Sequence, residues 1–174
     1  MRAVMRLTGL LIKKSLVVVI LVILLSPVAK IGKAAEVGEM TQLTITKITD
    51  GDSLRAGDIR IRLHGIDAPE MRQQCDNNGS YACGKQAQAY LAAFLGRRAT
   101  LRCAHIDTDR YKRLIMRCYH RGIDIGAAMV RAGWALAYRR YAKDYIADEQ
   151  EAKAAKRGLW AGTFQTPEAW RRAN

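Results

Sequence analysis

The sequence predicts a small α+β domain in which a β-barrel packs against helices. Short stretches with alternating apolar residues come first, a helical stretch follows, two further strands come next, and helices end the chain. Three or more strands, a helix, two strands and then helices are typical of a small barrel with helices around it. No repeat or low-complexity tract interrupts the chain after residue 35, so we expect one domain there.

The first strands are predicted from this alternation. Residues 41–49 mix leucine, isoleucine and threonine in a pattern that indicates a strand with a bend or bulge near Lys47. Asp50-Gly51-Asp52 is predicted to be a turn, and residues 53–55 to return to an extended conformation.

The next strand and the first helix have clearer patterns. Residues 59–63 alternate strictly, which predicts that the apolar side chains face a core and that Arg60 and Arg62 lie on the opposite face. Residues 84–95 place apolar side chains at helical spacing, and Gly96 ends the predicted helix.

The second half of the chain contains two strands joined by a long polar loop, and then two helices separated by a short extended stretch. We predict the strands at residues 100–103 and 114–119, the helices at 125–132 and 143–156, and the extended stretch at 134–138.

Residues 1–35 are predicted to be a secretory signal peptide. Basic residues without acidic ones precede an apolar run at 16–25, and small residues end the segment. The run has ten residues, whereas a membrane-spanning helix needs roughly 20. An uncleaved membrane anchor is the alternative. The remainder, residues 36–174, is expected to be exported as one domain, either secreted or periplasmic.

The chain is strongly basic, with 29 Lys and Arg against 16 Asp and Glu and a formal net charge of +13. Six of the basic residues and none of the acidic ones lie in residues 1–35, so the exported part keeps a net charge of +7. Such an excess favours polyanionic partners such as nucleic acid or an anionic membrane surface.

Four cysteines lie in the exported part, and an even number in an oxidising compartment indicates two disulfides. Of the three possible connectivities, local geometry favours Cys75–Cys83, which closes a polar loop, and Cys103–Cys118, which joins two strands. A zinc site is the alternative, and it is disfavoured because no close C-x2-C spacing or pair of neighbouring histidines is present.

Three short blocks of ionisable residues carry the chemistry, namely Asp50-Gly51-Asp52, residues 60–70 and residues 109–113. Together they offer carboxylate oxygens for a divalent cation, a further carboxylate as a base, and arginines with fixed guanidinium groups. Hydrolysis of a phosphodiester needs a metal to polarise the phosphoryl group, a base for water, and positive charge near the developing negative charge.

These blocks, in this order, resemble those of the thermonuclease or staphylococcal-nuclease-like family. That family shows an Asp-Gly-Asp-Thr turn, an Arg-Leu-x-Gly-x-Asp-x-Pro-Glu segment and an Asp-Arg/Lys-Tyr-Gly-Arg turn. This sequence has Asp-Gly-Asp-Ser at 50–53, the full middle pattern at 62–70, and Asp-Arg-Tyr-Lys-Arg at 109–113. The likeness spans about residues 41–160 and implies a five-stranded oligonucleotide-binding (OB) barrel with about three packed helices.

The resemblance also implies a metal site. It makes Ca²⁺ the cofactor, with the carboxylates of Asp52 and Asp67 and the backbone carbonyl of Ala68 as ligands, an all-oxygen set that suits calcium. The same correspondence assigns Glu70 to the carboxylate that activates or positions the attacking water.

The remaining roles concern the substrate. Arg62 and Arg113 match the two phosphate-binding arginines, whose forks hold phosphate oxygens in pairs. Tyr111 matches a tyrosine that lines the nucleotide site. Lys112 stands where the family has glycine, so we expect a lysine with positive φ that adds a cation beside the phosphate.

The sequence therefore predicts an exported, calcium-dependent nuclease that hydrolyses DNA and RNA without an obligate protein partner. The resemblance implies products that carry a 3′-phosphate. One alternative is a non-catalytic OB-fold protein of the cell envelope that binds nucleic acid. Another is a membrane-anchored envelope protein whose basic surface meets anionic lipid.

Overall fold

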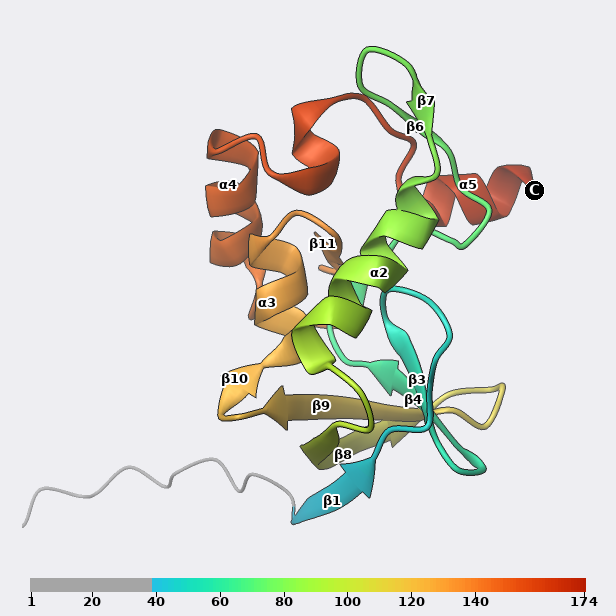
Figure 1. Cartoon of the computed structure of the whole chain (residues 1–174), viewed down its shortest axis with the longest axis vertical. Coiled ribbons are helices and arrows are strands. Elements are labelled where there is room, and N and C mark those ends of the chain that lie inside the picture. Colours follow the sequence, from blue (N-terminus) through green and yellow to red (C-terminus); the bar gives the residue numbers. More distant parts are fainter. Residues whose placement is uncertain (1–38) are drawn as a thin grey trace, which may run out of the picture. The chain divides into compact units, whose positions relative to one another are not determined.

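The computed structural model describes residues 39–174, which form an α+β domain as the sequence predicts (Figure 1). The predicted signal peptide, residues 1–35, lies outside the described residues. Within residues 39–174, no helix combines the length and the hydropathy needed to cross a membrane.

One curved sheet forms the centre of the domain. Its strands follow the order β1 (Met40–Thr44), β8 (Thr100–Thr108), β9 (Leu114–His120), β4 (Ile59–Leu63), β3 (Ser53–Ala56) and β2 (Lys47–Ile48). The β4–β9 pair is parallel, and the other pairs are antiparallel.

The two edges of this sheet are the halves of one bent strand. Only Ile45 and Thr46 separate β1 from β2, which stand at opposite ends of the strand order. The Ile45 amide donates to Ala99 O over 2.8 Å, and the Thr46 amide donates to Arg55 O over 2.8 Å. The sheet therefore curls into the predicted five-stranded barrel, and its edges meet at a bend next to Lys47.

Three smaller pairings complete the strands. They are β10 (Ile123–Asp124) with β9, β5 (Ile66–Asp67) with β11 (Leu136–Ala137), and β6 (Cys75–Asp76) with β7 (Ser80–Tyr81). The β5–β11 pair contains Asp67, one of the predicted metal ligands.

Helices pack around the barrel at the predicted places, and one helix was not predicted. The helices are α2 (Cys83–Leu95), α3 (Ile125–Arg131), α4 (Ile146–Ala154) and α5 (Pro167–Ala173), with a 3₁₀ turn at Gly158–Ala161. Figure 1 shows α5 beside the β6–β7 hairpin, on the side of the domain away from α4. The prediction missed α5, whose first turn is capped by the Thr166 side chain.

The core fills the space between the barrel and helices α2 and α3. Fully buried apolar side chains from these elements include Leu54, Ile61, Leu91, Leu101 and Met129. Two predictions were wrong at the edge of the core. Ile59 is exposed because it sits at the end of the β3–β4 hairpin. Strand β8 continues to Thr108 through the predicted polar loop, because β9 pairs with it past a register shift.

Both predicted disulfides form, and no cysteine of residues 39–174 is free. Cys103 and Cys118 are directly paired residues of β8 and β9. Cys75 and Cys83 link β6 to the first residue of α2. This disulfide fixes the C-terminal part of the loop between residues 68 and 83 to the start of the helix.

A buried carboxylate on α4 holds β11 in place. The Glu149 side chain is 1% exposed and accepts hydrogen bonds from the Ala137 amide, Arg139 and Lys153. Although burial opposes ionisation, the hydrogen bonds from Arg139, Lys153 and Ala137 hold the pKa of Glu149 below its ordinary value. Since β11 pairs with β5, this carboxylate also supports the strand that carries Asp67.

We predict that Glu149→Gln lowers the free energy of unfolding at pH 7 by about 2 kcal/mol, because two cations lose a buried anionic partner. A lowered pKa stabilises the fold above the unfolded-state pKa of about 4.3, and this contribution disappears as the pH falls through the folded-state value. The difference between variant and wild type should therefore shrink below about pH 4. Urea unfolding measures the difference in unfolding free energy, with Glu151→Gln, at an exposed position, as the control. Equal loss in both variants would contradict the special role of Glu149.

Candidate active site

Asp52 and Asp67 are brought together by three short strands. Asp52 immediately precedes β3, whose Ser53 lies opposite Arg62 in β4, and Asp67 ends β5 after the turn at Gly65. Arg62 donates from Nη1 to Oδ1 of Asp52 and, over 2.9 Å, from Nη2 to Oδ1 of Asp67. Both carboxylates are buried, so one guanidinium offsets the repulsion between two anions.

Two glycines allow this close approach. A Cβ at Gly51 would lie 2.7 Å from the Cβ of Ala68 and 3.0 Å from that of Ala87. A side chain at this position would therefore force the turn that carries Asp52 away from Ala68 and from helix α2. Gly65 has a φ of 74°, in the left-handed region that favours glycine. The Asp-Gly-Asp and Gly-x-Asp spacings of the sequence therefore have a steric basis here.

Asp52 is the most enclosed acid of the site. Its Oδ2 accepts the Ala68 amide over 2.7 Å, and its Oδ1 accepts the Ser53 hydroxyl over 3.1 Å. Burial raises the pKa of Asp52 to about 6, against the opposite effect of Arg62, and the neighbouring Asp50 adds to the increase. Because burial disfavours the ionised form of this carboxylate, additional positive charge beside it would stabilise that form.

Glu70 lies beside the Asp52–Asp67 pair, on a loop that the Gln73 side chain holds in place. Its amide donates to Oε1 of Gln73 over 3.2 Å, and the fully buried Gln73 donates in turn to Gln165 O over 2.6 Å. The Glu70 carboxylate accepts Nη1 of Arg171 over 2.9 Å. The same nitrogen donates to Oδ1 of Asp67 over 3.0 Å, so Glu70 and Asp67 are neighbours.

Arg171 is the residue of the site that the sequence analysis missed. It comes from α5, 104 positions after Asp67 in the sequence. The Thr166-Pro167 pair, a helix cap followed by proline at the first turn, was the available signal for the helix. That signal could reveal α5, but nothing in the local sequence indicates that Arg171 reaches Asp67.

The third predicted block forms the turn between β8 and β9. Arg113 donates from Nε to Oδ2 of Asp109 over 2.7 Å, and the Arg113 amide donates to Oδ1 of the same residue over 2.9 Å. Lys112 has the expected positive φ, 59°. The Tyr111 ring is exposed, and the guanidinium carbon atoms of Arg110 and Arg113 lie 4.8 and 5.7 Å from its centroid.

The structure pairs Arg113 with Asp109 and not with the carboxylates of the cluster. In the parallel β4–β9 pair, Ile115 lies opposite Arg62, and Arg113 lies two residues before Ile115, in the turn that leads into β9. Within residues 39–174, no hydrogen bond joins Arg113 to Asp52 or Asp67. The site thus consists of a tight cluster of Asp52, Arg62, Asp67 and Glu70, with Arg113 and Tyr111 on an adjacent hairpin.

The residue types of the cluster fit a hard cation. Asp52, Asp67 and the backbone of Ala68 offer oxygen only, which suits calcium with water and phosphate completing the shell. Thiolate ligation is excluded for residues 39–174, because the four cysteines form disulfides. Among the same residues, no group of three or more His, Cys, Asp or Glu is arranged to hold a metal.

Comparison with known proteins identifies one family that this chain matches. The model of the family described as staphylococcal nuclease homologue matches residues 60–162, which leaves Asp52 and Arg171 outside the matched segment. The chain is 32% identical to an uncharacterized endonuclease of Haemophilus influenzae over 142 residues, covering 77% of this chain and 75% of the relative.

Two further relatives match this chain over a smaller share of their own length. Succinoglycan biosynthesis protein ExoI of Rhizobium meliloti is 33% identical over 117 residues, covering 65% of this chain and 61% of the relative. The probable staphylococcal-like nuclease CAN2 of rice, Oryza sativa, is 32% identical over 124 residues, covering 70% of this chain and 31% of the relative. Since the family model matches more than half of the chain, the protein belongs to the staphylococcal nuclease homologue family and is a nuclease of the hydrolase class.

Proposed function

We propose that this nuclease is calcium-dependent and hydrolyses phosphodiester bonds in both DNA and RNA. The observation that carries the proposal is the convergence of Asp52 and Asp67 on Arg62, with Glu70 joined to the same cluster. Two oxygen ligands, a nearby third carboxylate and a guanidinium are the groups that metal-assisted phosphodiester hydrolysis requires.

The positions of the residues support the following division of roles. Asp52, Asp67 and the Ala68 carbonyl would hold Ca²⁺, which supplies positive charge to polarise the phosphoryl oxygens. Glu70, whose carboxylate is partly exposed, takes a proton from water as the water oxygen bonds to phosphorus. The bond from phosphorus to the leaving oxygen breaks, and that oxygen takes up a proton from solvent water. Arg62 stabilises the charge on the phosphoryl oxygens.

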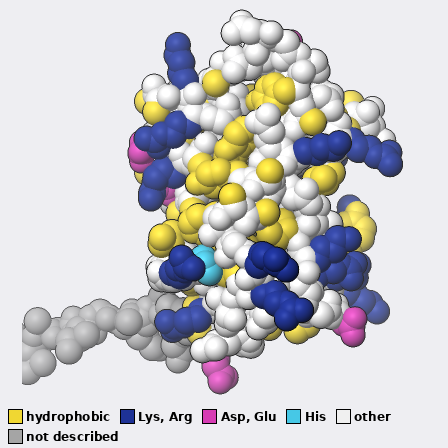
Figure 2. Space-filling view, viewed as in Figure 1, with side chains coloured by type: hydrophobic (Ala, Val, Ile, Leu, Met, Phe, Trp, Pro, Cys, Tyr) yellow, Lys and Arg dark blue, Asp and Glu magenta, His cyan; other side chains and the backbone are white. Residues whose placement is uncertain are grey.

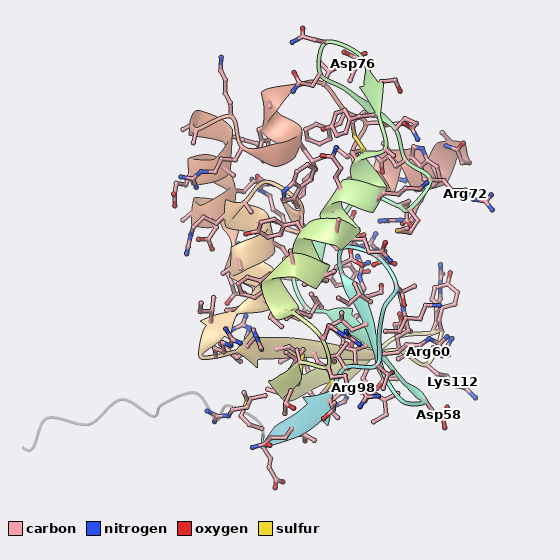
Figure 3. The ribbon with its side chains drawn as sticks, viewed as in Figure 1. Asp58, Arg60, Arg72, Asp76, Arg98 and Lys112 are labelled. Carbon is pink, nitrogen blue, oxygen red and sulfur yellow. A yellow bond between two sulfur atoms is a disulfide. The ribbon has the colours of Figure 1, made fainter. Side chains whose placement is uncertain are left out.

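The basic surface around the β3–β4 and β8–β9 hairpins supports both DNA and RNA as substrates. Figure 2 shows Lys and Arg side chains gathered at the lower right of the face, and Figure 3 places Arg60 and Lys112 on that side. Arg55 and Arg110 are also exposed on these hairpins. Contacts to phosphates carry no sequence information and are available in DNA and RNA alike.

We also propose that the protein acts after export, secreted or in the periplasm. Two disulfides, with no free cysteine in residues 39–174, support an oxidising compartment. The basic and apolar pattern of residues 1–35 supports a signal peptide, and N-terminal sequencing of the exported form distinguishes cleavage from membrane anchoring.

Calcium dependence gives the first test of this function. Excess chelator should abolish cleavage of DNA and RNA, Ca²⁺ should restore it, and Mg²⁺ should restore much less because it demands tighter octahedral geometry. Asp67→Asn should reduce the cleavage rate by about 10²-fold or more and leave the circular dichroism spectrum unchanged. Asp58→Asn, in the exposed β3–β4 turn, is the matched control (Figure 3). Full activity in excess chelator would contradict the proposal.

The arginines give a second test, which separates catalysis from binding. If Arg62 and Arg113 hold the phosphoryl group through their forks, Arg62→Lys and Arg113→Lys should each lower kcat by about 10²-fold or more. Arg98→Lys, on the exposed turn after α2, should not change kcat (Figure 3). Near-wild-type turnover in both site variants would favour a nucleic-acid-binding surface over the nuclease mechanism.

A further inference from the structure

Arg171 engages two of the three carboxylates that the proposed function uses. Its Nη1 and Nη2 donate to Oδ1 and Oδ2 of Asp67, each over 3.0 Å, which is a forked two-point pair. Its Nη1 also donates to Oε1 of Glu70 over 2.9 Å. The Arg171 side chain is 34% exposed, so it lies at the mouth of the site and has solvent to move into.

The position of Arg171 is built by several contacts that hold the segment before α5. Thr163 and Asp76 exchange two backbone hydrogen bonds, of 2.8 and 2.9 Å, which attach this segment to β6. Gln73 holds the Gln165 carbonyl, and the same side chain accepts the Glu70 amide. The loop of Glu70 and the start of α5 are therefore joined through one buried residue.

The disulfide Cys75–Cys83 stabilises the same attachment. It closes the loop of which Asp76 is part, next to the strand pair with Thr163. Pro167, at the first turn of α5, is buried as well. Because these contacts fix the beginning of the helix, the approach of Arg171 to Asp67 is a property of the fold rather than of a free chain end.

The pairing of Arg171 and the binding of a cation compete for the same lone pairs. The Oδ1 of Asp67 already accepts an N–H from Arg62 and one from Arg171, and Oδ2 accepts another from Arg171. A calcium ligand has to approach within about 2.3–2.6 Å of the ion, and the guanidinium would repel that ion at close range. Glu70, while paired with Arg171, is also less free to receive a proton from water.

We propose that Arg171 acts as an intramolecular competitor of the divalent cation at Asp67, so that α5 raises the cation concentration needed to load the site. The proposal rests on the metal site of the proposed function. Loading then requires Arg171 to leave Asp67 and Glu70, which removes its hydrogen bonds from both carboxylates in one movement. Arg171 is thus a regulatory residue of the site and not a ligand.

Calcium binding, measured by isothermal titration calorimetry without substrate, tests the proposal. Arg171→Gln should bind Ca²⁺ about tenfold more tightly than the wild type, because a charged two-point competitor is removed. Arg171→Lys keeps the charge but not the fork and should fall between the two. Arg172→Gln is the matched control, since Arg172 lies on the same helix, is 75% exposed and pairs with Glu168 instead. It should bind Ca²⁺ as the wild type does.

Tryptophan fluorescence gives a second readout, because Trp170 adjoins Arg171 on α5. Calcium should change the emission of the wild type, Trp170→Phe should remove that change, and Arg171→Gln should show a smaller one. The proposal is overturned if Arg171→Gln binds Ca²⁺ no more tightly than the wild type, or if Arg172→Gln binds it as tightly as Arg171→Gln.

The outcomes also distinguish the two proposals. If the wild type binds Ca²⁺, Asp67→Asn does not, and Arg171→Gln binds no tighter than the wild type, the competition is refuted while the metal site stands. If neither the wild type nor any Arg171 variant binds Ca²⁺, both proposals are refuted.

Discussion

The bridge from Arg62 to Asp52 and Asp67 is the interaction on which the site depends. Two buried carboxylates in one small volume repel each other and lose hydration, so they persist only with positive charge between them. Arg62 supplies that charge from β4, which pairs with β3 and comes directly before β5 in the chain. The register of β3 with β4 and the short β5 that follows set the geometry of the cluster.

The rest of the domain keeps this bridge in position. The barrel closes at the bend between β1 and β2, which fixes β3 and β4 in the sheet. From the other side, Glu149 holds β11, and β11 pairs with the strand that carries Asp67. A third support, the braced loop at Gln73, connects Glu70 to α5. The C-terminal helix is therefore linked to the chemistry of the site.

Features that depend on neighbouring residues could be predicted from the sequence. Alternation of apolar residues predicted the strands, and the family pattern at residues 50–70 selected the carboxylates that the structure brings together. The same pattern gave Arg62 a role toward phosphate and did not predict its bridge to Asp52 and Asp67. The positive φ of Lys112 followed from a turn that normally needs glycine. Short separations of 8 and 15 residues made the two disulfides predictable.

Features that depend on distant contacts could not be predicted. Whether residues 104–108 continue β8 is decided by pairing with β9, and their polar composition alone suggested a loop. Arg171 lies in a polar, charged segment near the chain end, and its partner is 104 positions away. Its role follows from how the segment at residues 162–166 attaches to β6 and Gln73, which is tertiary structure.

The most direct test of the metal site is a crystal structure of the protein with Ca²⁺, using anomalous scattering to locate the ion. We expect the ion between the carboxylates of Asp52 and Asp67 and the Ala68 carbonyl, with about 2.3–2.6 Å to its oxygen ligands and with Arg171 moved off Asp67. An ion bound elsewhere, with Arg62 and Arg171 both still on Asp67, would contradict the assignment.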